Sequence, residues 1–519
     1  GSVTVSGTTA MNGDGSNPMS VATSGTQDYT GAVTLGANTT LTVTGLSAGA
    51  INLDSNSNSY NLTIAEAGTG ADAGAVTGII SGGGAVASTG TGFLTLSGVN
   101  TYTGGTTVSN GILQADDAAA FGTGTVTVQS GGAVDVNGLT IANAFTLSGT
   151  GVSDSGALYN ASATAATVSG AISLAADTTI LTAGGLTLSG GIDAATSGGD
   201  SDLTIGNITG ETGVVTITGA SGAIGANDAI SSLTAAAELA IEANITTSGD
   251  QTYQNVVSGT TFTLDGAAIT FEDTVSTSGA LTVTNSGLLT VADGATITAD
   301  GGFTQSGGGD VSLGADITTV DNNISIGGAL TLLADTSMAT AASQTIELST
   351  GAGAGNIQVA SISGTNAGVN NSLNLISGTG TTTVSGAISG ITLLGLQDTG
   401  ATGAVSLQGG VTVNEISTAA AAYNISLTGG TNDVTQAMEF LNTGDVTLGN
   451  ANTDSFLFRG GLTAITQRRV NIEGKVQVAG SSTIDLGTGT HASNEGVFVF
   501  GTSQIGGSAD GSTDGNIDL

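Results

Sequence analysis

The chain has 519 residues, of which 87 are glycine and one is proline, and it contains no cysteine or tryptophan. Four lysine and arginine residues stand against 40 aspartates and glutamates, and the resulting net charge of −36 excludes nucleic-acid binding, because phosphate neutralisation requires clustered cations. The single proline excludes collagen, and an apolar fraction of 39% with only 8% charged residues excludes a disordered polyanion.

Both ends of the chain have the alternating pattern of a β-strand, Val3-Thr4-Val5 at the start and Asn516-Ile517-Asp518 near the end, and neither end has a cap. No linker or charge block divides the residues between them. No run of eighteen apolar residues is present, so we expect no transmembrane segment. We predict that residues 1–519 form a single elongated β-helix, which is a fragment of a longer secreted chain.

Two hexapeptides far apart in the chain are near copies, SGTQDY at residues 24–29 and SGDQTY at residues 248–253. Each is followed by strand-like runs, which indicates tandem organisation. These units resemble the repeats of large filamentous-haemagglutinin-type adhesins, and the resemblance implies a β-helix.

The most informative stretch is residues 92–136. Its runs Phe93–Leu96, Ile112–Gln114 and Val126–Val128 alternate apolar and small polar residues, which places one face of each run in a core and the other in solvent. Glycine-rich and Asn-Gly turns separate these runs, since glycine and asparagine adopt positive φ at little cost. The pattern predicts short strands joined by tight turns.

The same stretch resembles the passenger-associated repeat of bacterial autotransporters. The family pattern LTLSG-x-NTYTGGTTV-x-x-G-x-L occupies residues 94–113, and its usual GTGTVTV continuation occupies residues 122–128. The resemblance implies a right-handed parallel β-helix on a bacterial cell surface. Within it, the neighbouring carboxylates Asp116 and Asp117 could suggest the acid pair of a β-helical glycosidase. They lie where the repeat has its turn, however, and we interpret them as turn residues.

The clearest periodicity lies between residues 261 and 335. Apolar-polar-apolar triplets recur in three interleaved series with a spacing near 20 residues. The series begin at Phe262, Leu281, Phe303 and Ile324; at Ile269, Leu289, Val311 and Leu330; and at Val275, Ile297 and Ile317. Three series with one period predict an all-β fold, a right-handed parallel β-helix with about 20 residues and three short strands per coil, and therefore roughly 25 coils.

Two segments have helical propensity because they contain alanine, residues 232–239 and residues 434–440. Strand-like neighbours flank both. We interpret them as strands of the same β-helix.

Acidic loops such as residues 199–202 and Gly309-Asp310 resemble calcium-binding turns, but the tandem GGxGxD nonapeptide is absent. We interpret these aspartates as turn formers and expect no cofactor and no dedicated metal site, although weak, scattered Ca²⁺ binding by carboxylates is an open alternative. His491 is the only histidine, so a Ser-His-Asp triad would depend on it. Its loop lacks a glycine-framed nucleophile, and we expect no enzymatic activity.

The four cations lie within seventeen residues and close to phenylalanines. One interpretation is local neutralisation, with Asp454 and Glu473 as partners in exposed salt bridges. The other is a docking patch that holds another acidic chain of this kind or an anionic glycan. The candidate patch consists of Arg459, Arg468, Arg469, Lys475, Phe456 and Phe458, with Phe498 and Phe500 further along the chain.

These observations favour an extracellular adhesin or passenger-type stalk on a bacterial surface, secreted across the outer membrane. Its partners are expected to be host or neighbouring-cell surfaces, glycans, or other copies of the chain. The alternative is a structural subunit of an extracellular filament or sheath. A β-helical polysaccharide-active enzyme is a remote third hypothesis, because such enzymes need basic residues to stabilise developing negative charge.

Overall fold

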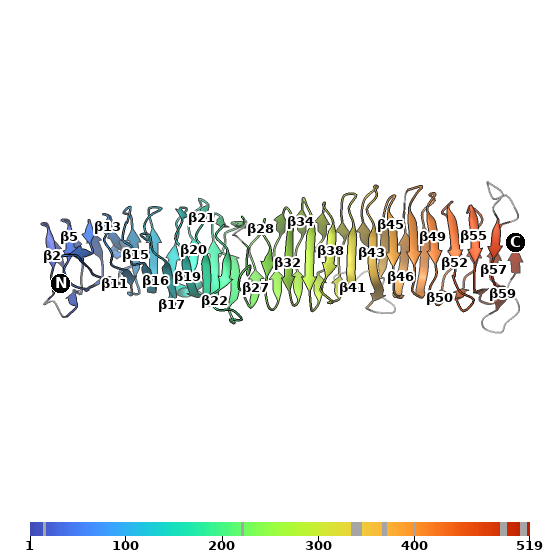
Figure 1. Cartoon of the computed structure of the whole chain (residues 1–519), viewed down its shortest axis with the longest axis horizontal. Helices are drawn as coiled ribbons and strands as arrows, with labels where there is room; N and C mark the ends of the chain where they lie inside the picture. Colours follow the sequence, from blue (N-terminus) through green and yellow to red (C-terminus); the bar gives the residue numbers. More distant parts are fainter. Residues whose placement is uncertain are drawn as a thin grey trace. The chain divides into compact units, whose positions relative to one another are not determined.

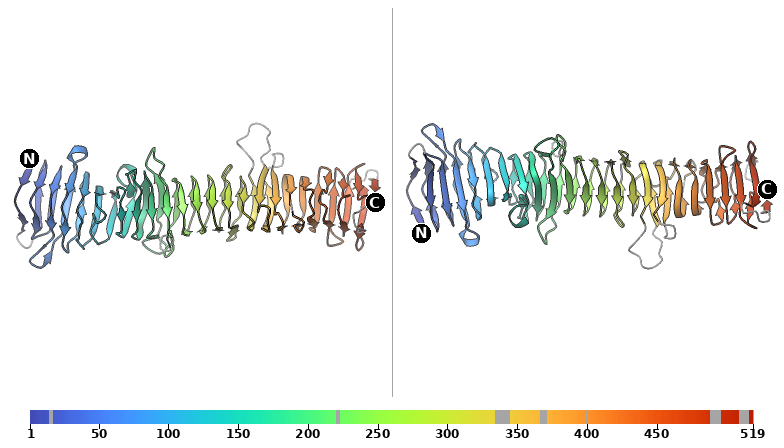
Figure 2. Two further views of the ribbon diagram at one scale, coloured as in Figure 1. Left: turned by 90° about the horizontal axis from the view of Figure 1, so that it is seen from above. Right: turned by 90° about the horizontal axis from the view of Figure 1, so that it is seen from below.

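The computed structural model describes residues 1–13, 17–219, 223–333, 345–365, 371–398, 400–487, 496–508 and 516–518. These residues form an all-β solenoid of parallel strands, with about 21 turns of roughly 22 residues. The chain clusters into two compact units, residues 1–258 and 259–519, and each is described by itself. In both units the strands of successive coils lie side by side (Figures 1 and 2). The single body expected from the sequence stays a prediction.

Unit 1 contains three parallel sheets, here called 1A, 1B and 1C in the order in which each coil visits them. Sheet 1A contains β1 (Val3–Val5), β4 (Gln27–Tyr29), β7 (Leu46–Ala48), β12 (Gly74–Val76), β15 (Phe93–Leu96), β20 (Leu158–Asn160), β25 (Asp202–Asn207), β27 (Ser232–Ala235) and β30 (Gln251–Tyr253). Sheet 1B contains β2 (Thr9–Met11), β5 (Val33–Leu35), β8 (Ile51–Asn52) and β13 (Ile80–Ser81), and then β18 (Thr140–Ile141), β21 (Ala166–Val168), β23 (Leu186–Leu188), β26 (Val215–Ile217) and β28 (Leu239–Ile241), with β31 (Val257–Gly259) at the unit boundary. Sheet 1C contains β3 (Met19–Ala22), β6 (Thr39–Val43), β11 (Leu62–Glu66), β14 (Val86–Ser88), β19 (Phe145–Gly149), β24 (Ile192–Ala194) and β29 (Ile245–Thr246).

Three long strands of unit 1 bend from sheet 1C into sheet 1A: β16 (Thr106–Ala115), β17 (Val126–Asp135) and β22 (Ile172–Thr182). A short antiparallel hairpin is formed by β9 (Asp54–Ser55) and β10 (Asn58–Ser59). The helices found among the described residues are two 3₁₀ turns, Gly70–Asp72 and Val152–Asp154. Within that part of the chain, no helix is long and apolar enough to cross a membrane.

Unit 2 has the same arrangement, with sheets called 2A, 2B and 2C. Sheet 2A contains β32 (Phe262–Gly266), β35 (Leu281–Asn285), β38 (Phe303–Ser306), β45 (Thr381–Val384), β47 (Ala404–Leu407), β49 (Asn424–Leu427), β52 (Asp445–Leu448), β55 (Arg469–Ile472) and β58 (Val497–Val499). Sheet 2B contains β33 (Ile269–Phe271), β36 (Leu289–Val291), β39 (Val311–Leu313), β50 (Thr431–Val434), β53 (Ser455–Phe458), β56 (Lys475–Val478) and β59 (Gln504–Ser508). Sheet 2C contains β34 (Val275–Thr277), β37 (Ile297–Ala299), β40 (Ile317–Thr318), β42 (Thr345–Ser349) and β44 (Ser372–Ile376). A separate four-stranded sheet continues this side of the coils with β51 (Met438–Glu439), β54 (Leu462–Thr463), β57 (Thr483–Asp485) and β60 (Asn516–Asp518), and it is counted here as part of 2C.

Four long strands of unit 2 join two sheets. The strands β41 (Ile324–Leu332) and β43 (Ile357–Gly364) bend from 2A into 2B, and β46 (Ile388–Leu396) and β48 (Val411–Thr418) bend from 2B into 2C. Each coil of unit 2 therefore passes through three sheets and encloses a narrow core.

The register predicted from the triplets is confirmed. Leu281 pairs with Phe262 in one neighbouring coil and with Phe303 in the other, and all three side chains are buried. The other two series pair in the same way, Ile269–Leu289–Val311–Leu330 and Val275–Ile297–Ile317. Along β35 the side chains alternate, with Leu281 and Val283 inward and Thr282 partly exposed. Period-2 alternation thus fixes which side chains form the core.

The two alanine-containing segments are strands, as interpreted from the sequence. Residues 232–235 and 239–241 are β27 and β28, and residues 431–434 and 438–439 are β50 and β51. Burial of one side of each segment in the stack outweighs the helical propensity of alanine.

The coils are longer than the sequence predicted, about 22 residues instead of 20, so there are about 21 turns instead of 25. The difference lies in the corners between strands. Phe145 pairs with Ile172, 27 residues further on, and Ile317 pairs with Leu348, 31 residues further on. Strand lengths are limited by the width of each sheet, whereas the corners accept insertions without disturbing the pairing.

Candidate functional site

The structure distributes the four cations around the coil. Arg468 and Arg469 lie at the corner that leads from sheet 2C to sheet 2A, since β54 precedes them and Arg469 begins β55. Lys475 begins β56, at the corner between sheets 2A and 2B. Arg459 directly follows β53, at the corner between sheets 2B and 2C. Residues that are close in sequence are therefore on three different corners.

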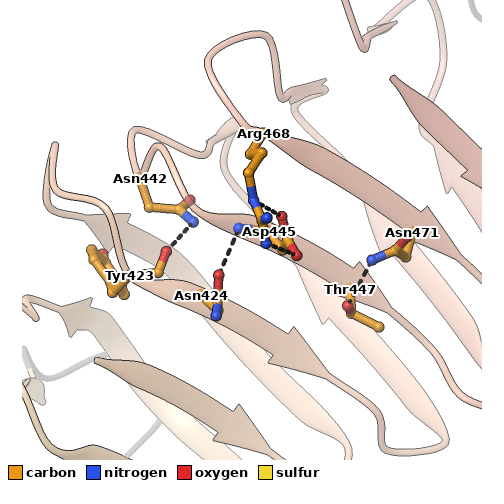
Figure 3. Close-up of polar contacts among 7 residues, drawn as sticks. All are labelled: Tyr423, Asn424, Asn442, Asp445, Thr447, Arg468 and Asn471. Carbon is orange, nitrogen blue, oxygen red and sulfur yellow. Dashed lines mark hydrogen bonds and ion pairs between the residues drawn. The ribbon is translucent and has the colours of Figure 1, made fainter. Parts of the chain in front are cut away.

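Two of these arginines form bidentate ion pairs with carboxylates of the preceding coil. Nε and Nη2 of Arg459 donate to the two carboxylate oxygens of Asp433 at 2.8 and 2.6 Å. Arg468 binds Asp445 in the same way at 2.9 and 2.6 Å, as Figure 3 shows. Both arginine side chains are nearly half exposed, so each pair contributes at most about 1 kcal/mol. Local neutralisation thus exists, but with Asp433 and Asp445 as partners where Asp454 and Glu473 were expected.

A ladder of polar side chains supports the Arg468 corner (Figure 3). The Asn424 Oδ1 accepts a hydrogen bond from the backbone N–H of Asp445 at 2.8 Å, and the Asp445 carboxylate in turn accepts from Arg468. On the outer face of sheet 2A, the Asn471 side chain of β55 donates to the hydroxyl group of Thr447 in the preceding coil at 3.4 Å. The ladder links three successive coils and fixes the position of the guanidinium group.

The two phenylalanines assigned to the patch are in the core. Phe456 and Phe458 are both only 1% exposed, and their rings stack with centroids 6.4 Å apart and planes inclined by 12°. They alternate with Leu457, which points outward from β53. By contrast, Phe498 and Phe500, about two coils further on, are 43% and 48% exposed.

The structure therefore does not bring these six residues together on one surface. The phenylalanine rings face inward, and the cations are divided among three corners. Arg468 and Arg469 are the two cations that remain neighbours. Partner binding by this pair stays a prediction.

In the stretch at residues 92–136, the asparagine of the repeat pattern lies at the position of the coil where other coils of unit 1 have a strand of sheet 1B. Sheet 1B has no strand between β13 and β18, and there the buried side chain of Asn100 bridges coils. Its Oδ1 accepts a hydrogen bond from the Ile80 backbone N–H at 2.7 Å, and its Nδ2 donates to the Ala120 carbonyl. One amide thus joins three coils at a spacing of 20 residues.

The tyrosine of the same pattern fills the corner beside this amide. Tyr102 is fully buried, and its hydroxyl lies 2.6 Å from the hydroxyl of Thr106, which donates to the Phe121 carbonyl. Burial raises the pKa of the Tyr102 hydroxyl, so it remains protonated and can donate. Gly105 and Gly111 have φ of +84° and +67°, a conformation that favours glycine. The pattern is therefore a set of core and turn residues.

Comparison with known families agrees with this geometry. Residues 89–115 match the family model of the passenger-associated-transport-repeat. The chain fits an autotransporter passenger-type β-helix. No curated protein and no solved structure matches it.

Buried polar side chains also close other corners of this parallel β-solenoid. In the near copies, Tyr29 donates to Gln27 Oε1 at 3.1 Å and Tyr253 donates to Gln251 Oε1 at 2.8 Å. The Gln27 amide donates further to backbone carbonyls of two neighbouring coils. The near copies thus share one corner motif, and their resemblance to filamentous-haemagglutinin-type repeats stays a prediction.

Glu66 is a buried carboxylate at such a corner. It is 1% exposed, its Oε2 accepts from the Leu46 backbone N–H at 2.8 Å, and its Oε1 accepts from the Gly68 N–H at 2.7 Å. Burial raises the pKa of the Glu66 carboxyl, and the hydrogen bonds from backbone N–H groups oppose that rise. The carboxyl group therefore holds two coils together at the expense of its own hydration.

The carboxylates considered as catalytic or calcium-binding groups accept hydrogen bonds from other groups of the chain. Asp117 Oδ1 accepts from the Ala119 N–H at 2.8 Å, which forms the turn expected at this position. Asp202 accepts from the Ser232 hydroxyl, and Asp310 accepts from the Ala329 N–H of the next coil. Across the described part of the chain, no group of three or more acidic, histidine or cysteine residues could hold a metal ion. His491 lies outside the described residues.

Sequence reasoning missed one surface feature, a groove of about 560 Å³ in unit 2. It lies where β41 and β43 bend from sheet 2A into 2B, beside β45. The one signal in the sequence is the pair Gly327-Gly328 in the middle of a strand pattern, because glycine inside a strand often marks a bend.

Proposed function

We propose that this chain is part of the stalk of a bacterial surface adhesin of the passenger type, secreted across the outer membrane and exposed outside the cell. The observation that carries the proposal is the passenger-associated repeat at residues 89–115, embedded in a parallel β-solenoid. Its Asn100 and Tyr102 contact other parts of the chain and leave the outer surface free for partners.

The outer surface is the part that acts in this proposal. It carries most of the net charge of −36, which disfavours close lateral association between copies through mutual repulsion. A stalk that stays separate from its neighbours can present its polar faces to a host or neighbouring cell. The chain therefore mediates attachment or cell–cell contact, with glycans as one class of partner.

The test is made on the native cells that produce the protein. Antibody against the chain labels intact cells, and electron microscopy of these cells shows separate projections. Deletion of the gene reduces attachment to surfaces or to neighbouring cells. Labelled continuous fibres would instead identify a structural subunit of a filament or sheath, and attachment that is unchanged after deletion would refute the adhesin function.

A further inference from the structure

The groove in unit 2 crosses three successive coils on the outer surface. Its lining consists of Ser325, Ile326, Gly327, Gln358, Val359, Ala360, Thr383, Ser385 and Gly386. Ser325 pairs in register with Gln358, and Gln358 pairs with Thr383, so the three polar side chains form one row across the coils. The hollow exists because the neighbouring positions carry little side chain. A Cβ atom at Gly386 would lie only 2.7 Å from the Ala360 carbonyl oxygen, so a larger residue does not fit there.

The row of polar side chains is available to a ligand. Among the described residues, the side chains of Ser325, Gln358 and Thr383 form no hydrogen bond with the rest of the chain. This differs from the corner amides of Asn100 and Gln27, which are bonded to backbone groups. Two hydroxyl groups and one amide, repeated at about 4.8 Å per coil, therefore offer donors and acceptors in a line.

The charge and the backbone pairing narrow the choice of ligand. All nine lining residues are uncharged, in a chain with 40 acidic residues. The groove lacks the cations that an acidic polymer needs, and the net charge repels such a polymer. An extended peptide cannot add to these strands as a further strand, because β43 already pairs with β41 on one side and β45 on the other. Hydroxyl and amide groups beside small apolar surface fit a ligand with many hydroxyl groups and C–H faces.

We propose that this groove binds a segment of an uncharged polysaccharide, with the polymer lying along the row of Ser325, Gln358 and Thr383. The inference rests on the proposed attachment function and deepens it by naming the glycan class. Gln358 donates and accepts at the centre of the row, and the two hydroxyl groups bind sugar hydroxyls on either side. Gly327, Ala360 and Gly386 give the sugar rings room to approach the backbone.

The test is calorimetric titration of the full chain with cellohexaose and maltohexaose as neutral probes and with hexagalacturonate as the acidic probe. We expect at least one neutral probe to bind and the acidic probe not to bind. The variant Gln358→Ala weakens binding about 3- to 10-fold, the effect of one lost hydrogen bond. Thr383→Asp weakens it at least as much, whereas Thr412→Asp, the same change on an exposed threonine of β48 outside the groove, leaves it unchanged.

Each outcome of the titrations either supports or overturns polysaccharide binding in the groove. Failure of both neutral probes to bind, equal binding of the acidic probe, or binding that survives Gln358→Ala and Thr383→Asp would overturn the inference. Melting curves of the variants that match the native chain show that the fold is intact. Loss of cell attachment on gene deletion, together with no binding of neutral probes, would refute the groove inference and leave the adhesin function in place.

Discussion

Replacing Leu281 tests the stacked core most directly. Its side chain is fully buried, and it lies between Phe262 and Phe303 of the two neighbouring coils. Leu281→Ala removes three carbon atoms, which corresponds to about 2.4 kcal/mol of lost hydrophobic burial at about 0.8 kcal/mol each. The aromatic rings on both sides are held by their own coils and cannot fill the space. The cavity that remains raises the expected loss of stability to about 3–4 kcal/mol.

Aspartate substitutions separate the inward from the outward side of the same strand. Leu281→Asp places an unpaired carboxylate in a dry stack and destabilises more than the alanine variant. Thr282→Asp, the matched control, changes the adjacent side chain, which points outward from β35, and costs little. The two variants carry the same added charge one residue apart.

Hydrogen exchange read by mass spectrometry, combined with thermal melting, measures these effects. In a solenoid each coil contacts mainly its neighbours, so the loss of protection is expected first in residues 262–318, which comprise the coil of β35 and the two coils that stack on it. A comparable loss of stability in Leu281→Asp and Thr282→Asp would refute the assignment of inward and outward faces. Equal loss of protection along all of unit 2 would refute the local character of the stack.

Four further predictions concern corners and charges. Glu66→Gln removes a buried carboxyl group whose pKa is raised by burial. Because the folded state binds this proton more tightly than the unfolded state, the native chain loses stability as the pH rises from the ordinary glutamate pKa through the raised one. Denaturation series at several pH values are expected to show this loss in the native chain and not in the variant. Identical pH dependence of both proteins contradicts the assignment. Asn100→Ala leaves the Ile80 N–H and the Ala120 carbonyl without their hydrogen-bond partner, which lowers the stability by about 1–3 kcal/mol for each group. The loss is measured as a lower denaturation midpoint. An unchanged midpoint means that water replaces the amide. Arg468→Glu combined with Arg469→Glu tests the docking interpretation of this arginine pair. That interpretation requires self-association or anionic-glycan binding that the double variant loses while it retains the fold, measured by sedimentation and titration. If neither is lost, the two arginines serve local charge balance only. Millimolar Ca²⁺ or added salt raises the melting temperature, because repulsion between close carboxylates of adjacent coils costs about 1 kcal/mol per pair before screening. A constant melting temperature shows that the carboxylates lie too far apart to interact.

Much of the fold could be predicted from the sequence because the in-out alternation of a strand is a local property. The triplets at Phe262, Leu281 and Phe303 repeat at nearly constant spacing, and burial of one face leaves a single register that keeps all three in the core. The same reasoning interpreted residues 232–239 and 434–440 as strands despite their helical propensity, and these segments coincide with parts of β27, β28, β50 and β51. The repeat pattern around Asn100 was also visible in the sequence, although its bridging role was not.

The candidate site could be predicted much less well, because position around the coil depends on the corners. Arg459, Arg468 and Lys475 are near one another in the sequence, yet a coil of roughly 22 residues carries them to three different corners. Phe456 and Phe458 have the same spacing as any inward pair, and only their partners in neighbouring coils decide that both are buried.

The sequence by itself therefore determined the strands, the parallel stacking and the composition of the core, since these follow from alternation and from a repeat that recurs along the chain. Tertiary structure alone decided the partners of the two paired arginines, the coil-bridging contacts of Asn100 and Glu66, and the groove along Ser325, Gln358 and Thr383. The physical reason is the length of the corners. Insertions between strands leave the register intact but change which side chains of successive coils meet on the surface, and no local pattern records that result.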